Sequence, residues 1–181
     1  RLGFIRKALP ILDSKAKYAV YRGFVRPVLE YCPLSWLGAS QSTLNQLDRV
    51  QHRALKLIGP GSYLPSLTVR RQVAALTFLY KLHWIDGPPI LTTMTPPRAV
   101  ANQHRRSTRH QQKNQHQHQL APTLPAGARN SALRSFPHAT IQDWNRLPSA
   151  LLRNLPTQKG MQAFKEGAYK SLQSRDWHSA T

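Results

Sequence analysis

Acidic residues are scarce in this chain. The 181 residues include seven Asp and Glu against 26 Lys and Arg, which gives a formal net charge of +19. No two acids lie within four residues of one another. Polymerases and nucleases that use two metal ions need clustered carboxylates to hold them. The sequence therefore predicts no two-metal catalytic site.

Cysteine is nearly absent as well. The single Cys32 can form no internal disulfide and no Cys-rich zinc site. We expect it at the end of a helix, where the helix dipole disfavours a thiolate, so we interpret it as a small core residue. His116 and His118 could form an exposed metal-binding pair, but no Cys or acid lies nearby to complete the site. We expect no metal site.

Motifs that bind cofactors or build nucleophilic sites are missing too. The chain contains no G-x-S-x-G, no Walker loop and no G-x-G-x-x-G. No apolar run approaches the roughly 20 residues that span a bilayer. The sequence therefore predicts no catalytic residue, no cofactor, no small-molecule substrate and no membrane partner.

The excess of positive charge is the strongest signal that the chain does carry. Such an excess indicates a polyanionic partner, and nucleic acid is the commonest one. An anionic membrane surface is one alternative, but it requires exposed apolar helix faces beside the basic ones. A basic chain without any such partner is the other alternative.

Three segments in the first half carry apolar residues at three- and four-residue spacing, which is typical of amphipathic helices. The predicted helices cover residues 15–31, 43–58 and 67–84. Pro27 lies within the first, so we expect a kink or a break near Gly23. The apolar stripes, which we expect to pack together, are Ala16, Ala19, Val20, Phe24, Val28 and Tyr31; Leu44, Leu47, Val50, Ala54, Leu55 and Ile58; and Val69, Val73, Leu76, Leu79, Tyr80 and His83.

Each predicted helix also has a suitable residue in front of it. Side-chain oxygens of Ser, Thr, Asp and Asn accept hydrogen bonds from the first free N–H groups of a helix. A glycine after the last turn commonly ends a helix. The expected caps are Asp13 or Ser14, Ser40 or Ser42, and Ser66, and the expected stop of the second helix is Gly59.

The composition changes in the second half. Residues 94–128 are rich in Pro, Gln and His and poor in aliphatic residues, so we expect them to be extended or disordered. An extended stretch at 131–136, a short helix from Pro137 to Arg146 and a helix at 158–172 are predicted beyond them. The fold class is therefore mainly α. The expected domains are a small helical bundle over residues 1–86, a basic, partly disordered arm over 87–128, and a short helical and extended C-terminal segment over 129–181.

Basic side chains gather on one face of the second predicted helix. Their spacing places them opposite the apolar stripe, and Asp48 is the only acid in that helix. Such a stripe can follow a phosphate backbone, although an ordinary solvated helix face has the same pattern. The candidate nucleic-acid contacts on this face are Arg49, His52, Arg53 and Lys56.

Two further basic groups are candidate phosphate contacts. Arg70 and Arg71 lie near the start of the third helix, where free backbone N–H groups add donors. The run RRSTRHQQK concentrates charge in the arm, and flexible arms of this kind bind RNA or DNA electrostatically. A solvated linker is the alternative for that run. Its cations are Arg105, Arg106, Arg109 and Lys113.

Several runs resemble one family, the reverse transcriptases of non-LTR (LINE-type) retrotransposons. YRGFVRPVLEYCPLSW (21–36) and LDRVQHRALKLIG (47–59) resemble the thumb region, and RRSTR, RSFPHATIQDWNRLP and AFK resemble the tail that follows it. The matching positions are Tyr21, Val25, Pro27, Leu29, Tyr31, Trp36, Leu47, Val50, Gln51, Ala54, Leu55 and Ile58 in the thumb, and Arg109, Arg134, Phe136, Trp144, Asn145, Leu147, Pro148 and Phe164 in the tail.

The resemblance implies contact with a template–primer, and therefore RNA or an RNA–DNA hybrid as partner. The family's aromatic-x-Asp-Asp catalytic turn does not occur, so no catalytic residue is carried over. The first residues read like the middle of a helix that begins upstream, which predicts a fragment whose missing palm and fingers would be partner domains. A nuclear location follows if the parent element's role is retained. The alternative is a free-standing basic helical host protein, derived from a retroelement, that binds nucleic acid or another protein.

Overall fold

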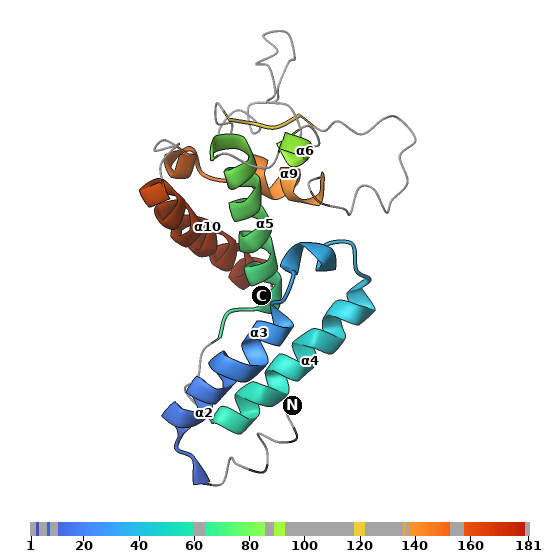
Figure 1. The fold of residues 1–181 in the computed structure, drawn as a ribbon, viewed down its shortest axis with the longest axis vertical. Helices are drawn as coiled ribbons and strands as arrows, with labels where there is room; N and C mark the ends of the chain where they lie inside the picture. The colour runs from blue at the N-terminus through green and yellow to red at the C-terminus, as the bar shows by residue number, and fades with distance from the viewer. Residues whose placement is uncertain are drawn as a thin grey trace. The chain divides into compact units, whose positions relative to one another are not determined.

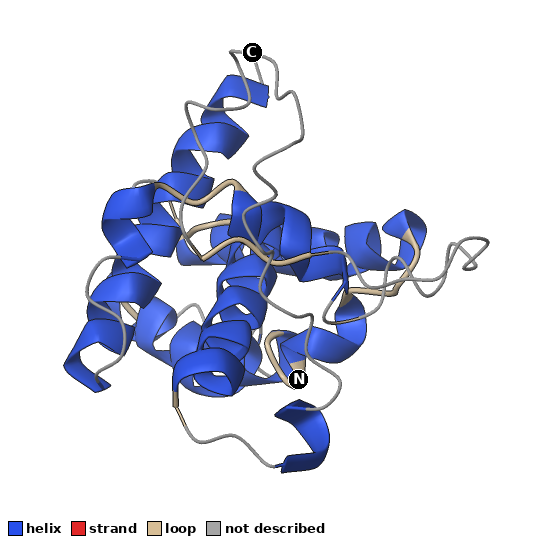
Figure 2. Cartoon of the chain, turned by 90° about the horizontal axis from the view of Figure 1, so that it is seen from above, coloured by secondary structure: helices blue, strands red, loops and turns tan. Residues whose placement is uncertain are grey.

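The computed structural model of this chain is mainly helical, as predicted, and contains no β-strand among its described residues (Figures 1 and 2). Contacts between Cα atoms divide the chain into two compact units, Arg1–Arg71 (unit 1) and Gln72–Thr181 (unit 2). The sequence-based domain limits stay a prediction. The described residues are 3, 7, 11–59, 64–85, 89–92, 118–121, 136, 138–152 and 158–179.

Unit 1 begins with a helical segment that changes its pitch. It consists of α2 (Ser14–Val20), a π-helical turn η2 (Tyr21–Val25) and α3 (Arg26–Leu29). Asp13 caps it, since its carboxylate accepts a 2.8 Å hydrogen bond from the Ala16 N–H. Pro27 has no N–H to donate, and a wider turn directly before it keeps the chain helical. The break expected near Gly23 is therefore a π turn.

The buried face of this segment differs from the predicted one. Tyr21, Val25 and Leu29 are buried in the core of unit 1. Three members of the predicted stripe are exposed instead: Phe24 by 65%, Val28 by 49% and Tyr31 by 77%. The segment carries two apolar stripes side by side, and only one of them can face the neighbouring helix. Spacing alone selected the wrong one.

The second long helix, α4 (Gln41–Ile58), runs back along α2–α3 (Figure 1). It starts two residues earlier than predicted, with Ser40 Oγ accepting from the Thr43 N–H at 3.3 Å. It ends at Gly59, whose φ of 113° suits glycine. A β-carbon at Gly59 would lie 3.5 Å from Ser14 Oγ, so the end of α4 lies beside the start of α2.

The connection between α3 and α4 contains the single cysteine. Cys32 has a left-handed backbone with φ 48° and is exposed, so the prediction of a core position is wrong. The short 3-10 helix η3 (Pro33–Trp36) follows directly, and the Cys32 carbonyl accepts from the Ser35 N–H at 3.0 Å and its hydroxyl at 2.8 Å. The tight turn requires this backbone at position 32 and turns the thiol to solvent.

Helix α5 (Leu67–Trp84) starts where predicted, with Ser66 Oγ accepting from the Val69 N–H at 3.1 Å. Its first five residues belong to unit 1, where Leu67 joins the core, and the remainder belongs to unit 2. The predicted stripe is buried except for His83, which is half-buried. Further buried apolar residues, Ala75 and Leu82, show that α5 is covered on more than one side.

Unit 2 packs around an aromatic cluster. Trp144 is fully buried, stacks on Trp84 with 5.1 Å between ring centroids, and lies 5.6 Å from the Phe164 ring. Tyr80 packs against Phe164 at 4.7 Å. These tryptophans are core residues, as expected. The further helices are α6 (Pro89–Thr92), α9 (His138–Asn145), η4 (Ser149–Leu152) and α10 (Gln158–Ser179), the last seven residues longer than predicted.

A short extended segment, residues 118–121, is held by the end of α9. Asn145 accepts from the Leu120 N–H and donates to the Leu120 carbonyl, both at 2.9 Å. Trp144 Nε1 donates to the His118 carbonyl at 2.8 Å. Asn145 therefore recognises backbone and not a side chain. The extended stretch predicted at 131–136 lies outside the described residues except for Phe136, which packs edge-on against Phe78.

Candidate nucleic-acid interface

The basic side chains predicted on the second helix share one exposed face of α4. Arg49, His52, Arg53 and Lys56 are all exposed, while the opposite side of the helix is buried. A ring nitrogen of His52 lies 3.0 Å from the Asp48 carbonyl oxygen. Within the described residues, neither Arg49, Arg53 nor Lys56 forms an ion pair. We call these four side chains the α4 basic face.

The acids of unit 1 are all engaged elsewhere. Asp13 caps α2, as described above. Glu30 lies 2.7 Å from Arg26 Nε and 2.5 Å from Arg70 Nη1. Asp48 lies 3.9 Å from Arg71 Nη2. Residues 1–71 contain no other Asp or Glu. The positive charge of the α4 basic face is therefore uncompensated within its own unit.

Two exposed cations outside α4 were not singled out from the sequence. Lys15 lies in α2, whose start is beside the end of α4, and Arg22 lies in η2. The Arg22 guanidinium carbon is 5.9 Å from the centroid of the Tyr18 ring, within cation–π range. Both cations add to the uncompensated charge of unit 1. The absence of nearby acids in the sequence was the available signal.

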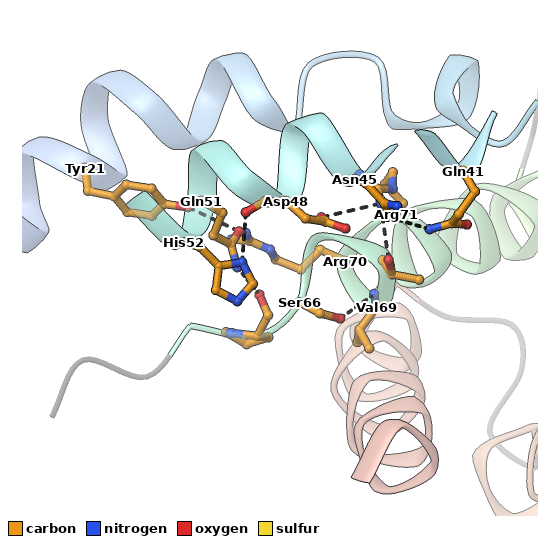
Figure 3. A network of polar contacts seen from close by, with 12 residues as sticks. Tyr21, Gln41, Asn45, Asp48, Gln51, His52, Ser66, Val69, Arg70 and Arg71 are labelled. Atoms are coloured by element: carbon orange, nitrogen blue, oxygen red, sulfur yellow. Dashed lines mark hydrogen bonds and ion pairs between the residues drawn. The ribbon is translucent and has the colours of Figure 1, made fainter. Parts of the chain in front are cut away.

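Arg70 and Arg71 occupy a different environment from the one predicted. Their exposed fractions are 7% and 4%, and both side chains reach α4 instead of solvent (Figure 3). Arg70 Nη2 donates to Gln51 Oε1, and its Nη1 forms the ion pair with Glu30. Arg71 Nη2 donates to Thr68 Oγ1 at 3.2 Å and faces Asp48.

Gln51 is the centre of this polar network. Its side-chain oxygen also lies within reach of the Tyr21 hydroxyl, which donates at 3.4 Å, and its amide nitrogen donates to the Pro65 carbonyl at 3.1 Å (Figure 3). One buried amide thus connects η2, α4, the loop before α5 and Arg70. The sequence stripe did not identify Gln51 as a core residue because polar side chains are excluded from such patterns.

Burial has an electrostatic effect on Arg71. Loss of hydration lowers the pKa of its guanidinium, the negative charge of Asp48 raises that pKa, and the neighbouring Arg70 lowers it. A buried, paired guanidinium has few donors left for an external phosphate. The arrangement therefore does not favour phosphate contact by Arg70 and Arg71, and it assigns them to holding α5 against α4.

The remaining predicted contacts, Arg105, Arg106, Arg109 and Lys113, lie outside the described residues, so their role stays a prediction. His118 is described and packs edge-on against Trp84 at 5.6 Å, while His116 is not described.

Two other kinds of site are absent from the described ranges. No group of three or more His, Cys, Asp or Glu side chains there is placed to hold a metal ion. No helix there is both long and apolar enough to cross a bilayer. Comparisons with protein-family models, curated proteins and solved structures found no match to this chain.

Proposed function

We propose that this chain binds nucleic acid, and that it is the thumb and C-terminal tail of a non-LTR retrotransposon RNA-directed DNA polymerase. The observation that carries the binding proposal is the α4 basic face, which is exposed and free of acids because every acid of unit 1 is engaged elsewhere. A phosphate backbone supplies the missing negative charge and releases its counterions on binding. The expected ligands are RNA and RNA–DNA hybrids.

Binding through this face depends little on base sequence. Arg and Lys on an exposed helix meet phosphate oxygens, which are the same at every nucleotide. The role proposed for the chain is therefore to hold a template–primer while other domains carry out the chemistry. The resemblance of residues 21–36 and 47–59 to a polymerase thumb supports this role.

We expect these 181 residues to have no polymerase activity of their own. Phosphoryl transfer needs clustered metal-binding carboxylates, and the sequence has no two acids within four residues of one another. The palm and fingers of the parent polymerase would supply them. Primer extension by the purified chain would contradict both this expectation and the assignment to the thumb.

A free-standing host protein derived from a retroelement is the second candidate. Unit 1 favours it in one respect, because residues from α3, α4 and the start of α5 close a core of their own. The gene structure separates the two candidates. A palm-coding frame directly upstream of Arg1 supports the polymerase fragment, and an intact short gene with its own start codon supports the host protein.

The binding proposal is tested by the salt dependence of affinity. The full chain is titrated into a labelled RNA–DNA hybrid at several salt concentrations. Replacing Arg49, Arg53 and Lys56 with alanine should lower the slope of log affinity against log salt by about three, one for each phosphate that is no longer neutralised. The fold should remain intact, since the three side chains are exposed.

A matched control removes cations from another surface. Lys165 and Lys170 are exposed on α10 in unit 2, and their replacement with alanine should leave the slope close to that of the parent chain. Equal decreases in both variants would mean that net charge alone drives binding. Binding that does not depend on salt, or an α4 variant that binds like the parent, would overturn the proposal.

A further inference from the structure

Unit 1 exposes two aromatic rings beside its positive charge. Phe24 and Tyr31 are exposed by 65% and 77%, and Val28 between them by 49%. Their spacing of four and three residues places them on one side of the segment η2–α3 and the turn after it. Large apolar side chains gathered on one exposed surface commonly mark a binding site.

The charge of the surrounding unit restricts the kind of partner. Residues 1–71 contain twelve Lys and Arg and three acids, a net charge of +9. Lys15 and Arg22 are exposed on the same helical segment, which itself has no exposed acid apart from the capping Asp13. A ligand that combines flat apolar groups with regular negative charge fits this surface. Nucleic acid with unpaired bases has both.

We propose that Phe24 and Tyr31 form a stacking surface for unpaired bases, so that unit 1 binds single-stranded nucleic acid in preference to duplex. The inference rests on the proposed function and specifies its ligand. In a duplex the base faces are covered by their neighbours, whereas in a single strand they are free to stack on protein rings. The single strand is either free RNA or an unpaired extension of a hybrid.

The spacing of the two rings indicates one base for each. Seven residues of helix correspond to about 10 Å along the axis, too far for both rings to enclose a single base. Stacking on one aromatic ring typically changes affinity by roughly tenfold when the ring is removed. The two rings together therefore distinguish single strand from duplex without reading sequence.

The test compares two ligands and four variants of the full chain. The ligands are an oligouridylate of about 12 nucleotides, within the usual site size of single-strand binders, and an RNA–DNA hybrid of the same length. The variants Phe24→Leu and Tyr31→Leu keep an apolar side chain but remove the flat ring. Tyr31→Trp keeps a ring, and Val28→Ala removes apolar surface without touching a ring. Circular dichroism checks that each variant retains its helices.

Stacking predicts a specific pattern of affinities. Each leucine variant should bind the oligouridylate roughly tenfold more weakly, with hybrid affinity and salt slope nearly unchanged. Tyr31→Trp and Val28→Ala should bind like the parent chain. Equal affinity of the parent for both ligands, or leucine variants that bind oligouridylate normally, would overturn the inference.

Self-association through the same surface is the competing outcome. A second copy would use Val28 as much as the rings, so Val28→Ala would then shift a monomer–dimer equilibrium measured by sedimentation. Dimers that dissociate in all three apolar variants, with oligouridylate binding unchanged, would reject base stacking. If the alanine variant of Arg49, Arg53 and Lys56 also binds normally, the proposed function fails as well. If that variant binds more weakly while the leucine variants do not, only the stacking inference fails.

Discussion

Arg70 Nη1 lies 2.5 Å from Glu30 Oε1, and this ion pair ties the start of α5 to the end of α3. The two atoms form an ion pair without hydrogen-bond geometry, and the Arg70 side chain is almost fully buried while that of Glu30 is 28% exposed. Removing one member of a buried pair leaves an uncompensated charge in the protein interior. The pair is therefore a weak point of unit 1 as well as a contact.

Glu30→Gln should destabilise the chain. Breaking a buried pair costs several kcal/mol, and the partial exposure of Glu30 reduces this to about 2–3 kcal/mol of the free energy of unfolding. Urea denaturation followed by circular dichroism measures it. Arg26→Gln is the matched control, because it breaks the other, more exposed contact of Glu30 and should cost less than about 1 kcal/mol. Equal costs in both variants would show that burial of Arg70 is unimportant.

Asn145→Ala should destabilise unit 2 by about 2–3 kcal/mol. The substitution removes both hydrogen bonds to the backbone of Leu120, whose side chain is buried, and leaves its N–H and carbonyl without that partner. Asn145→Asp keeps the acceptor for the Leu120 N–H but directs a carboxylate at the Leu120 carbonyl, so it should be destabilising too. Thermal unfolding measures both. An alanine variant as stable as the parent chain would mean that solvent replaces the amide at no cost.

Local signals in the sequence predicted much of the fold. Asp13, Ser40, Ser66 and Gly59 each act as expected, because caps and stops depend on residues within one turn of the helix end. The exposed position of the α4 basic face followed equally from helical spacing. Its lack of ion pairs could be anticipated because acids are rare in the whole chain.

Long-range packing was not predictable in the same way. The choice between Phe24 and Val25 as the buried residue depends on the π turn, which moves side chains around the helix axis. Arg70 and Arg71 resemble exposed phosphate contacts in sequence, and they are buried because Gln51, Glu30 and Asp48 come from other elements. Such pairings join residues far apart in the chain, and no local pattern records them.

Gly167→Ala should reveal how closely α10 packs on η4. A β-carbon there would lie 2.1 Å from Leu151 Cδ2, so the leucine side chain must move. Alanine favours a helix over glycine by about 1 kcal/mol, which opposes this cost. We expect a net decrease of about 1 kcal/mol or less in the free energy of unfolding, since overpacking typically costs 1–3 kcal/mol. In a Leu151→Ala background the same change should be stabilising, and a double-mutant cycle from urea denaturation measures the difference.

Asp48→Asn should lower stability and raise nucleic-acid affinity at once. Asp48 is the only acid in α4, so its removal increases the net positive charge beside Arg49 and Arg53 and should strengthen binding of an RNA–DNA hybrid at low salt. The same change removes the ion-pair partner of the buried Arg71 and should cost about 1–2 kcal/mol, a value reduced for the partial exposure of Asp48.

The pH dependence of that cost follows from the pKa of Arg71. Asp48 raises this pKa against the larger lowering by burial, so the substitution lowers it further. A base whose pKa is lowered on folding destabilises the folded state below the folded pKa, and the penalty disappears only above the unfolded value of 12.5. The destabilisation by Asp48→Asn should therefore be constant from about pH 5 to pH 9, because the guanidinium stays charged throughout.

A double-mutant cycle with Arg71→Met separates the two effects of Asp48→Asn. Methionine fills a similar volume without charge, so Arg71→Met alone should change stability little. In that background Asp48→Asn should no longer destabilise the chain, yet it should still strengthen binding, because Arg71 is buried away from the ligand while Asp48 is not. Urea denaturation and hybrid titration on the same four proteins measure both quantities. If Asp48→Asn costs as much with methionine at position 71 as with arginine, the 3.9 Å contact contributes nothing and the buried guanidinium is stabilised by Thr68 and the helix alone.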